Sequence, residues 1–278
     1  MVKFGVISWV WVYPFDTSCI SKASKHGFDG IEIPIEDPKY IDVKRIKDQL
    51  NSNGIECSSL AVVMSPERDA KSVDKGVRRN AMEYIKRCVN CAVDLGTQIV
   101  MGPIYSSAGP TLEAPDKKSE WKRAVESVKD MAKYAEDRDI YLCIEPLNRF
   151  ENHLINTIDE TLKFIEDVNS SNVKIHFDTF HANIEEKSFE DALKKCGKNL
   201  YHFHACENDR GTPGSGHIPW NEVANTLKAI GYDRYLVIET FQPNIEEIAA
   251  AAAIWRPLAP SQDSLAGEGL KFLKELFG

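Results

Sequence analysis

Short apolar segments alternate with longer amphipathic segments along the whole chain. The apolar segments are rich in β-branched and aromatic residues, which is typical of strands buried on both faces. They are residues 3–9, 28–35, 55–63, 97–103, 140–147, 172–178, 200–206 and 235–240. The amphipathic segments repeat apolar residues every three or four positions. They predict helices near 16–26, 41–53, 72–95, 119–137, 157–168, 188–196, 219–230 and 244–255, with a last helix near 264–277.

The repeated strand–helix pairs predict the fold. Glycines follow four of the predicted helix ends, at Gly27, Gly54, Gly96 and Gly231, where left-handed C-caps are common. No linker or low-complexity segment divides the chain, so we expect one domain over residues 1–278. Such a series indicates an α/β fold, a single (β/α)8 TIM barrel with an extra C-terminal helix. A doubly wound open sheet is the alternative, but its GxGxxG fingerprint is missing after the first strand.

Four of the predicted strands carry an ionisable residue at or near their carboxyl ends. Because the carboxyl ends of the strands form the active-site face of such a barrel, these side chains are expected to lie together. They are Glu145, Asp178, His204 and Glu239. Three carboxylates and one imidazole form an oxygen-rich ligand set that suits Mn²⁺, with Co²⁺ or Mg²⁺ as alternatives. Each residue alone would fit a salt-bridged strand end, but their coincidence on successive strands predicts a metal centre.

Three further residues flank this predicted centre. His176 and His202 each precede a predicted ligand by two positions, so they face the same way in their strands. We expect them to lie beneath the centre as hydrogen-bonded supports rather than as ligands. Cys206 lies two positions beyond His204 and could mimic a ligand, but a soft thiolate suits a hard ligand set poorly, so we leave it out of that set.

The charge balance is acidic and narrows the choice of partners. Forty-two acidic residues against 34 basic ones give a net charge of −8, which repels phosphate backbones and anionic lipid headgroups. We therefore expect neither nucleic acid nor a membrane as a partner. The apolar start MVKFGVISWVWVYPF lacks the charged region and cleavage site of a signal peptide, and seven cysteines form no CxxC…CxxC pattern. Both observations indicate a cytoplasmic protein with reduced, buried thiols.

Several motifs resemble those of one known family. They are EPLNRFE at 145–151, DTFHANIEE at 178–186, HACENDRGTPGSGHIPW at 204–220 and IWR at 254–256. In this order and at these intervals they resemble the ketose 3-epimerases, which include D-tagatose 3-epimerase and D-allulose (D-psicose) 3-epimerase. The resemblance covers nearly the whole chain. It implies an isomerase that epimerises free ketoses at C3, and a homodimer or homotetramer.

The resemblance also implies roles for individual residues. The family's Mn²⁺ ligands match Glu145, Asp178, His204 and Glu239. The first and last of these also match its catalytic pair. Its substrate-binding residues resemble Glu151, His181, Arg210 and Trp11.

The implied reaction requires such a pair of glutamates. Epimerisation beside a ketone removes a proton from one face of a carbon and returns one to the other face, which takes two acid/base groups. Glu145 and Glu239 would serve as these groups. A glutamate alone is far too weak a base for this proton, so a metal chelated by the ketose oxygens would stabilise the enediolate. It would also orient the substrate between the two carboxylates.

The remaining motif residues have simpler predicted roles. We expect Arg149 to form a structural ion pair, and Glu185 and Glu186 to form a solvated approach to the next helix. Two departures from the family concern the distal, C4 to C6 end of the sugar. Ser8 stands where a tyrosine is common in the family, and Ala108 where a tryptophan is common. These two departures leave the preferred ketose undetermined, but they do not change the expected reaction.

Other functions are alternatives. An aldose–ketose isomerase, an inosose dehydratase or a hydroxypyruvate isomerase would use the same barrel, but NRFE together with DTFHANIEE favours epimerisation. A non-catalytic sugar-binding protein would have no need of both glutamates. An apurinic endonuclease usually has more metal ligands and a basic face, which this acidic chain lacks.

Overall fold

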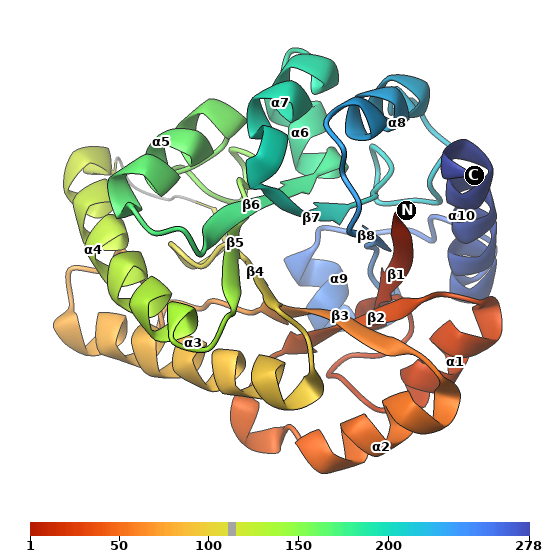
Figure 1. Ribbon diagram of the computed structural model, residues 1–278, viewed down its shortest axis with the longest axis horizontal. Coiled ribbons are helices and arrows are strands. Elements are labelled where there is room, and N and C mark those ends of the chain that lie inside the picture. The colour runs from red at the N-terminus through yellow and green to blue at the C-terminus, as the bar shows by residue number, and fades with distance from the viewer. Residues whose placement is uncertain (111–114) are drawn as a thin grey trace.

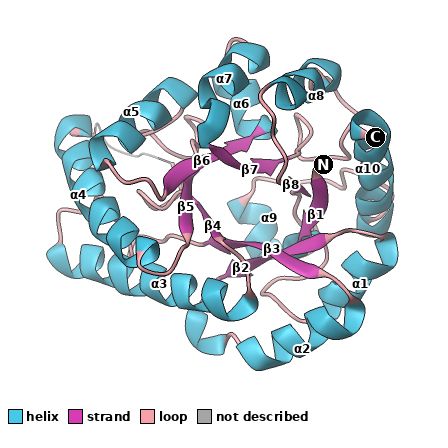
Figure 2. Ribbon diagram, viewed as in Figure 1, coloured by secondary structure: helices cyan, strands magenta, loops and turns pink. Residues whose placement is uncertain are grey.

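Eight parallel strands pair in chain order, and β8 pairs with β1, so that the sheet closes into a barrel (Figures 1 and 2). The computed structural model describes residues 1–110 and 115–278. Its strands are β1 (Lys3–Ile7), β2 (Gly30–Ile35), β3 (Glu56–Val62), β4 (Ile99–Gly102), β5 (Tyr141–Ile144), β6 (Val173–Asp178), β7 (Leu200–His204) and β8 (Tyr235–Ile238). The predicted barrel is therefore confirmed. The open-sheet alternative is wrong, because β1 and β8 pair with each other instead of forming free edges.

Helices surround the barrel (Figure 2). They are α1 (Ser18–His26), α2 (Val43–Asn53), α3 (Lys75–Leu95), α4 (Lys117–Glu136), α5 (Ile158–Val168), α6 (Thr179–Glu185), α7 (Phe189–Cys196), α8 (Trp220–Ala229), α9 (Glu246–Ala251) and α10 (Gln262–Phe277). The extra C-terminal helix is α10, which packs on α8 and β8. The sequence pattern does not predict α6, because this helix starts on the residue after β6 and is too short to show a helical period.

Local sequence determines where these helices begin and end. α5 begins with a capping box, in which the Thr157 hydroxyl accepts from the Glu160 N–H and the Glu160 carboxylate accepts from the Thr157 N–H. α1 and α2 end at Gly27 and Gly54, whose φ angles of 85° and 63° turn the backbone N–H back onto the last helical turn. These left-handed caps are the reason that glycine marks the helix ends in the sequence.

Near the active-site end, the barrel wall separates an apolar layer outside from a polar layer inside. Phe177 in β6 and Phe203 in β7 stack with their ring centroids 5.6 Å apart, and Phe177 also meets Phe189 of α7. The alternate positions of β6 include His176 and Asp178, which point to the opposite face of the strand. Polar side chains that burial normally disfavours are thus gathered inside this end of the barrel.

A small apolar cluster covers the ends of β1 and β8. Phe241, which follows β8, packs with Ile248 in α9 and with Ile254. Trp9, just after β1, lies against this cluster with its ring centroid 5.6 Å from that of Phe241. These contacts fix α9 beside the carboxyl ends of the two strands, and Figure 1 shows it through the middle of the barrel.

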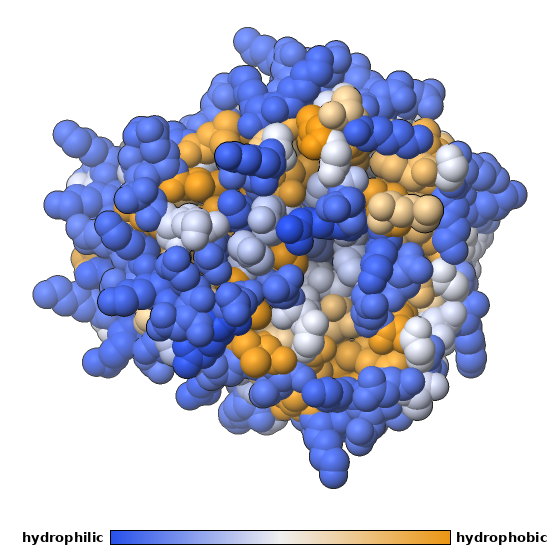
Figure 3. Space-filling model, viewed as in Figure 1, coloured by the Kyte–Doolittle hydropathy of each residue, from blue (hydrophilic) through white to orange (hydrophobic). Residues whose placement is uncertain are grey.

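The outer surface is largely hydrophilic. In the view of Figure 3, hydrophilic residues cover the periphery, and apolar ones are exposed mainly nearer the centre. Within the described parts of the chain, no helix combines the length and apolarity needed to cross a membrane.

Candidate active site and metal centre

The four predicted metal ligands meet at the carboxyl end of the barrel. Asp178 and His204 end β6 and β7 and face each other in register, while Glu145 and Glu239 directly follow β5 and β8. All four side chains are buried, with residue exposures between 1% and 6%. Candidate ligand atoms of Asp178, His204 and Glu239 lie within 4.8 Å of one another, and a Glu145 oxygen lies within the same distance of Asp178.

A carboxylate from β2 orients the His204 ring. His204 Nε2 donates to Glu32 Oε1 at 2.9 Å, so Nδ1 faces Asp178 Oδ2 at 3.6 Å and Glu239 Oε2 at 3.4 Å. Nδ1 is buried and has no hydrogen-bond partner among the described residues. Burial acts to lower the pKa of His204, but the Glu239 and Glu32 carboxylates raise it well above its usual value. A buried ring nitrogen directed at two carboxylates, with the other nitrogen bound to a third, is the arrangement of a metal-ligating histidine.

Glu32 is a functional residue that the sequence analysis missed. It lies fully buried within β2, where its Oε2 accepts from the Ser59 hydroxyl at 2.6 Å and is 2.7 Å from His202 Nε2. Burial acts to raise the pKa of Glu32, but His204 and His202 hold it well below its usual value. The feature of the sequence that could have identified Glu32 is its position as the one carboxylate in the otherwise apolar run GIEIPI.

His176 and His202 lie beneath the centre, as predicted. His176 meets the His204 ring edge-on with 4.1 Å between centroids, and its Nδ1 is 3.6 Å from Glu145 Oε2. Neither nitrogen of His176 has a hydrogen-bond partner among the described residues, so the expectation of a hydrogen-bonded support is wrong for this ring. Burial lowers the pKa of His176 well below its usual value, so the ring is neutral.

Arg210 places a buried cation among the carboxylates. Its Nη1 donates to Asp178 Oδ2 at 2.8 Å and also to Glu239 Oε2. Burial acts to raise the pKa of Asp178, but the Arg210 guanidinium holds it well below its usual value. Burial and then the Glu239 carboxylate raise the pKa of Glu145 well above its usual value. The cluster therefore holds one carboxyl group that favours its ionised form and one that favours its protonated form.

Asn148 connects His181 and Glu151. The Asn148 backbone N–H donates to His181 Nδ1 at 3.1 Å, and its side-chain amide donates to Glu151 Oε1 at 2.7 Å. Burial lowers the pKa of His181, so the ring is neutral, and its Nε2 lies 3.2 Å from Arg210 Nη2. This Nε2 lies 3.7 Å from Glu145 Oε1. His181 is thus a neutral ring that contacts both Arg210 and Glu145, and Asn148 connects it to Glu151.

The ion pair predicted for Arg149 is present. Arg149 donates from Nε and Nη2 to the two carboxylate oxygens of Glu185 at 3.0 and 2.9 Å. The Glu185 side chain is only 5% exposed, and Glu186 accepts from the Ile158 N–H at the start of α5. The expected solvated approach is therefore wrong, because both glutamates fix α6 to neighbouring elements through charge-assisted hydrogen bonds.

A loop organised around Glu207 carries Arg210. Glu207 is fully buried, and its carboxylate accepts from the N–H groups of Gly214 and Ile218 and from the indole of Trp220 at 2.8 to 3.0 Å. Arg210 itself has a φ of 66°, in the left-handed region. The buried Glu207 carboxylate thus connects both ends of the loop. It thereby fixes the position of the backbone from which the Arg210 side chain extends.

The C-terminal helix α10 packs against this loop. Its Phe272 ring meets Trp220 edge-on at 5.9 Å between centroids, and a Cβ on Gly214 would be 2.7 Å from the same ring. Gly269 of α10 approaches Pro213 equally closely, since a Cβ there would be 2.8 Å from the proline ring. The two glycines allow the helix and the loop to touch directly.

The structure does not bring Trp11 to the cluster. Its indole donates to Asp263 Oδ1 at 2.8 Å, and its ring stacks on His26 with 5.8 Å between centroids. The prediction assumed that the first strand reaches residue 9, whereas β1 ends at Ile7 and a 3₁₀ turn follows at Ser8–Val10.

Other aromatic residues stand beside the centre. The Arg210 guanidinium lies 4.1 Å from the centre of the Phe180 ring and 5.2 Å from that of Phe241. Trp9 packs on Phe241 and donates from its indole to Glu36 Oε1 at 3.0 Å. The sequence analysis missed these residues, because aromatic side chains after apolar strands resemble ordinary core residues.

Cys206 also lies beside the cluster. Its Sγ is 3.5 Å from Asp178 Oδ2 and 3.2 Å from Arg210 Nη1. Two-residue alternation beyond β7 directs it to the same side as His204.

The two positions that depart from the family differ in exposure. Ser8 is fully buried, and its hydroxyl has no hydrogen-bond partner among the described residues. Ala108 is exposed in the loop after β4. Their effect on specificity stays a prediction.

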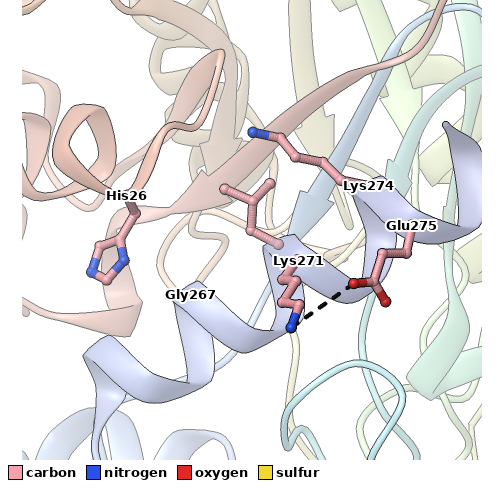
Figure 4. A pocket seen from close by; sticks show the side chains of 6 residues that line it. His26, Gly267, Lys271, Lys274 and Glu275 are labelled. Carbon is pink, nitrogen blue, oxygen red and sulfur yellow. Dashed lines mark ion pairs between the residues drawn. The ribbon is translucent and has the colours of Figure 1, made fainter.

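Two surface hollows lie outside the barrel, with volumes of about 390 and 410 Å³. The first lies between α1 and α10 (Figure 4) and is lined by His26, Gly267, Leu270, Lys271, Lys274 and Glu275. The second is lined by residues of α3 and of the loops after β2 and β3. Neither hollow is lined by a predicted site residue.

Comparison with known proteins agrees with this geometry. Residues 20–276 match a family described as xylose isomerase-like TIM barrel. A probable ketose 3-epimerase of Synechocystis sp. is 32% identical over 99% of this chain and 97% of its own length. A D-psicose 3-epimerase of Ruminiclostridium cellulolyticum is 35% identical over 94% of this chain and 92% of its own. The crystal structure of a D-allulose 3-epimerase from Methylomonas sp. in complex with D-allulose superposes with a TM-score of 0.94 at 29% identity, covering 99% of this chain and 96% of that one.

Proposed function

The chain belongs to the ketose 3-epimerases within the xylose isomerase-like TIM barrels, and on that premise we propose that it catalyses metal-dependent epimerisation of free ketoses at C3. Its family makes it an isomerase of the epimerase class. The observation that carries the proposal is the position of Glu145 and Glu239, which are buried on either side of Asp178 and His204 in the barrel wall.

The two glutamates supply the proton transfers. Glu145 follows β5 and Glu239 follows β8, with β6 and β7 between them. A ketose held over Asp178 and His204 would present one face of C3 to each glutamate. One carboxylate would remove the C3 proton, and the other carboxylic acid would return a proton to the opposite face. The burial of both glutamates would limit the access of water to the intermediate.

The side chains at this site fit a divalent metal. The fit rests on His204 Nδ1, which is buried, lacks a hydrogen-bond partner among the described residues and faces Asp178 and Glu239. Asp178, His204, Glu145 and Glu239 would hold the ion, for which we propose Mn²⁺, with Co²⁺ or Mg²⁺ as alternatives. When bound, it would supply Lewis-acid stabilisation of the negative charge that develops on the ketose oxygens.

Neighbouring residues would bind and orient the sugar. The Arg210 guanidinium is 5% exposed, so its hydrogen bonds to sugar oxygens would form with little competition from water. His181 would place its Nε2 beside a sugar hydroxyl, and Glu151 would act through Asn148 or directly on a sugar hydroxyl. Phe241, with Trp9 packed against it, would provide an apolar wall beside Arg210.

A panel of free ketoses tests the proposal. Purified protein is incubated with Mn²⁺ and each of D-allulose, D-tagatose, D-fructose and L-ribulose, and the products are separated by chromatography. We expect the C3 epimer of at least one ketose. Formation of an aldose would favour an aldose–ketose isomerase instead. Binding without turnover would favour a sugar-binding protein.

The proposed assembly is a homodimer or homotetramer. Light scattering coupled to size exclusion tests it, since a mass of 31.3 kDa corresponds to a single chain.

A further inference from the structure

We propose that Glu36 is a positioning residue of the sugar site, which holds the Trp9 indole in place so that Trp9 and Phe241 form an apolar wall for the bound ketose. The inference rests on the proposed function, because this wall would contact the same substrate. It deepens that function by assigning a residue that determines substrate affinity rather than the rate of the proton transfers. Glu36 would act through Trp9 and would touch neither the metal nor the reacting carbon.

The three residues follow strands that are neighbours in the barrel. β1 lies between β8 and β2. Trp9 follows β1, Glu36 directly follows β2, and Phe241 follows β8. The Trp9 indole donates to Glu36 Oε1 at 3.0 Å, and its ring centroid lies 5.6 Å from that of Phe241. Trp9 is therefore held by residues from both neighbouring strand ends.

Phe241 connects this wall to the cluster of proposed metal ligands. The centre of its ring lies 5.2 Å from the Arg210 guanidinium, and Arg210 Nη1 donates to Asp178 and Glu239. Only two side chains, those of Phe241 and Arg210, thus link Trp9 to the ligands. A ketose that binds Arg210 would therefore have the wall beside it.

The backbone of Glu36 is fixed by α3 and by the loop after β3. Arg68 donates from Nη2 to the Glu36 carbonyl and from Nε to the Val63 carbonyl, both at 2.8 Å. The Arg68 guanidinium lies 4.1 Å from the centre of the Tyr84 ring, and the Tyr84 hydroxyl donates to the Ile35 carbonyl at 2.6 Å. These contacts join the carboxyl ends of β2 and β3, so the Glu36 side chain extends from a rigid base.

The Glu36 carboxyl group suits this role in either protonation state. Burial raises its pKa, and the hydrogen bond from Trp9 acts against this rise. Both the ionised and the protonated group offer an oxygen that accepts from the indole. Because an indole carries a single N–H, this bond leaves Trp9 without a donor for the sugar. We therefore expect the wall to contact C–H groups of the ketose and to contribute contact area rather than hydrogen bonds.

Steady-state kinetics of matched variants test the inference. In Glu36→Ala we expect KM for the ketose to rise between about threefold and about 30-fold, while kcat and Mn²⁺ binding stay within about twofold of the wild type. Glu36→Gln keeps an oxygen acceptor, so its KM should stay within about twofold of the wild type. Asp167→Ala is the control, because Asp167 in α5 accepts from the Trp121 indole in α4 at 2.9 Å, outside the barrel. Its KM should not change.

A double-mutant cycle identifies the path of the effect. Trp9→Phe keeps an aromatic ring but removes the N–H that Glu36 accepts. If Glu36 acts through the indole, adding Glu36→Ala to Trp9→Phe should change KM by less than about twofold. A full rise of KM in both backgrounds would overturn the inference. Trp9→Phe alone should also raise KM, and it provides the same test if Glu36→Ala does not fold.

The outcomes separate this inference from the proposed function. Circular dichroism identifies the folded variants. Where the wild type forms C3 epimers, three results overturn the role of Glu36 and leave the proposed function intact: an unchanged KM in folded Glu36→Ala, a loss that falls on kcat alone, or a raised KM in folded Glu36→Gln. A wild type that epimerises none of the ketoses overturns the proposed function and the inference with it.

Discussion

Replacing Arg210 by glutamine should change metal affinity and catalysis in opposite directions. In the metal-free protein, Nη1 of Arg210 donates to Asp178 Oδ2 and Glu239 Oε2, two oxygens that would also bind the metal. An incoming ion must displace this nitrogen. Arg210→Gln removes the competing cation and leaves the carboxylates with less compensating charge, so we expect tighter metal binding.

The magnitude follows from the hydrogen bonds that the ion displaces. One hydrogen bond to a charged group is worth about 1.5–3 kcal/mol, and about 1.4 kcal/mol corresponds to a factor of ten. Counting only one of the two bonds, Mn²⁺ should bind between about tenfold and about 150-fold more tightly. The same guanidinium would bind the sugar, so kcat/KM at saturating Mn²⁺ should fall by a similar factor.

Isothermal titration with Mn²⁺ and steady-state kinetics at saturating Mn²⁺ measure the two effects. Arg149→Gln is the matched control, because Arg149 is 63% exposed and pairs with Glu185 outside the cluster. We expect the control to retain both values within about twofold. Mn²⁺ binding that is weaker or unchanged in folded Arg210→Gln would refute the idea that the guanidinium competes with the metal.

Three further predictions test the remaining residues. Glu145→Gln or Glu239→Gln should each reduce epimerisation at least about tenfold, or ~1.4 kcal/mol, in folded protein; greater residual activity in either would contradict a two-base mechanism. Chelation should abolish turnover and added Mn²⁺ should restore it, so full turnover in metal-free protein would exclude the metal centre. Ala108→Trp should sharpen the preference among ketoses, since a few apolar contacts contribute about 1–3 kcal/mol; ratios of kcat/KM within about twofold of the wild type would place residue 108 outside the pocket.

The sequence predicts the barrel and its four strand-end ligands for a physical reason. A charged residue that ends a buried strand is conspicuous in the sequence, as Asp178 is after the apolar residues of β6. Closure of a parallel barrel then brings such ends together without further information. The choice of the four candidate ligands therefore depends on local pattern and topology, both of which can be read from the chain.

The missed features depend on contacts between distant segments. Glu32 reads as an isolated charge, because its partner His204 lies 172 positions away in the chain. Trp11 was favoured as a pocket residue because the pattern does not show that β1 ends at Ile7. Cys206 was left out of the ligand set because sulfur is a soft donor, and its contact with Asp178 across the barrel comes from backbone alternation beyond β7.

The contacts of α10 support loops at the candidate active site, although no predicted catalytic, metal-binding or substrate-binding residue lies in this helix. Phe272 supports the loop that carries Arg210, and Asp263 holds the indole of Trp11 just after β1. Removing α10 would therefore remove contacts both to the loop that carries Arg210 and to the turn after β1. In protein engineering, the end of this chain is consequently a poor place for deletions or rigid fusions, and an extension should begin beyond Phe277 through a flexible spacer.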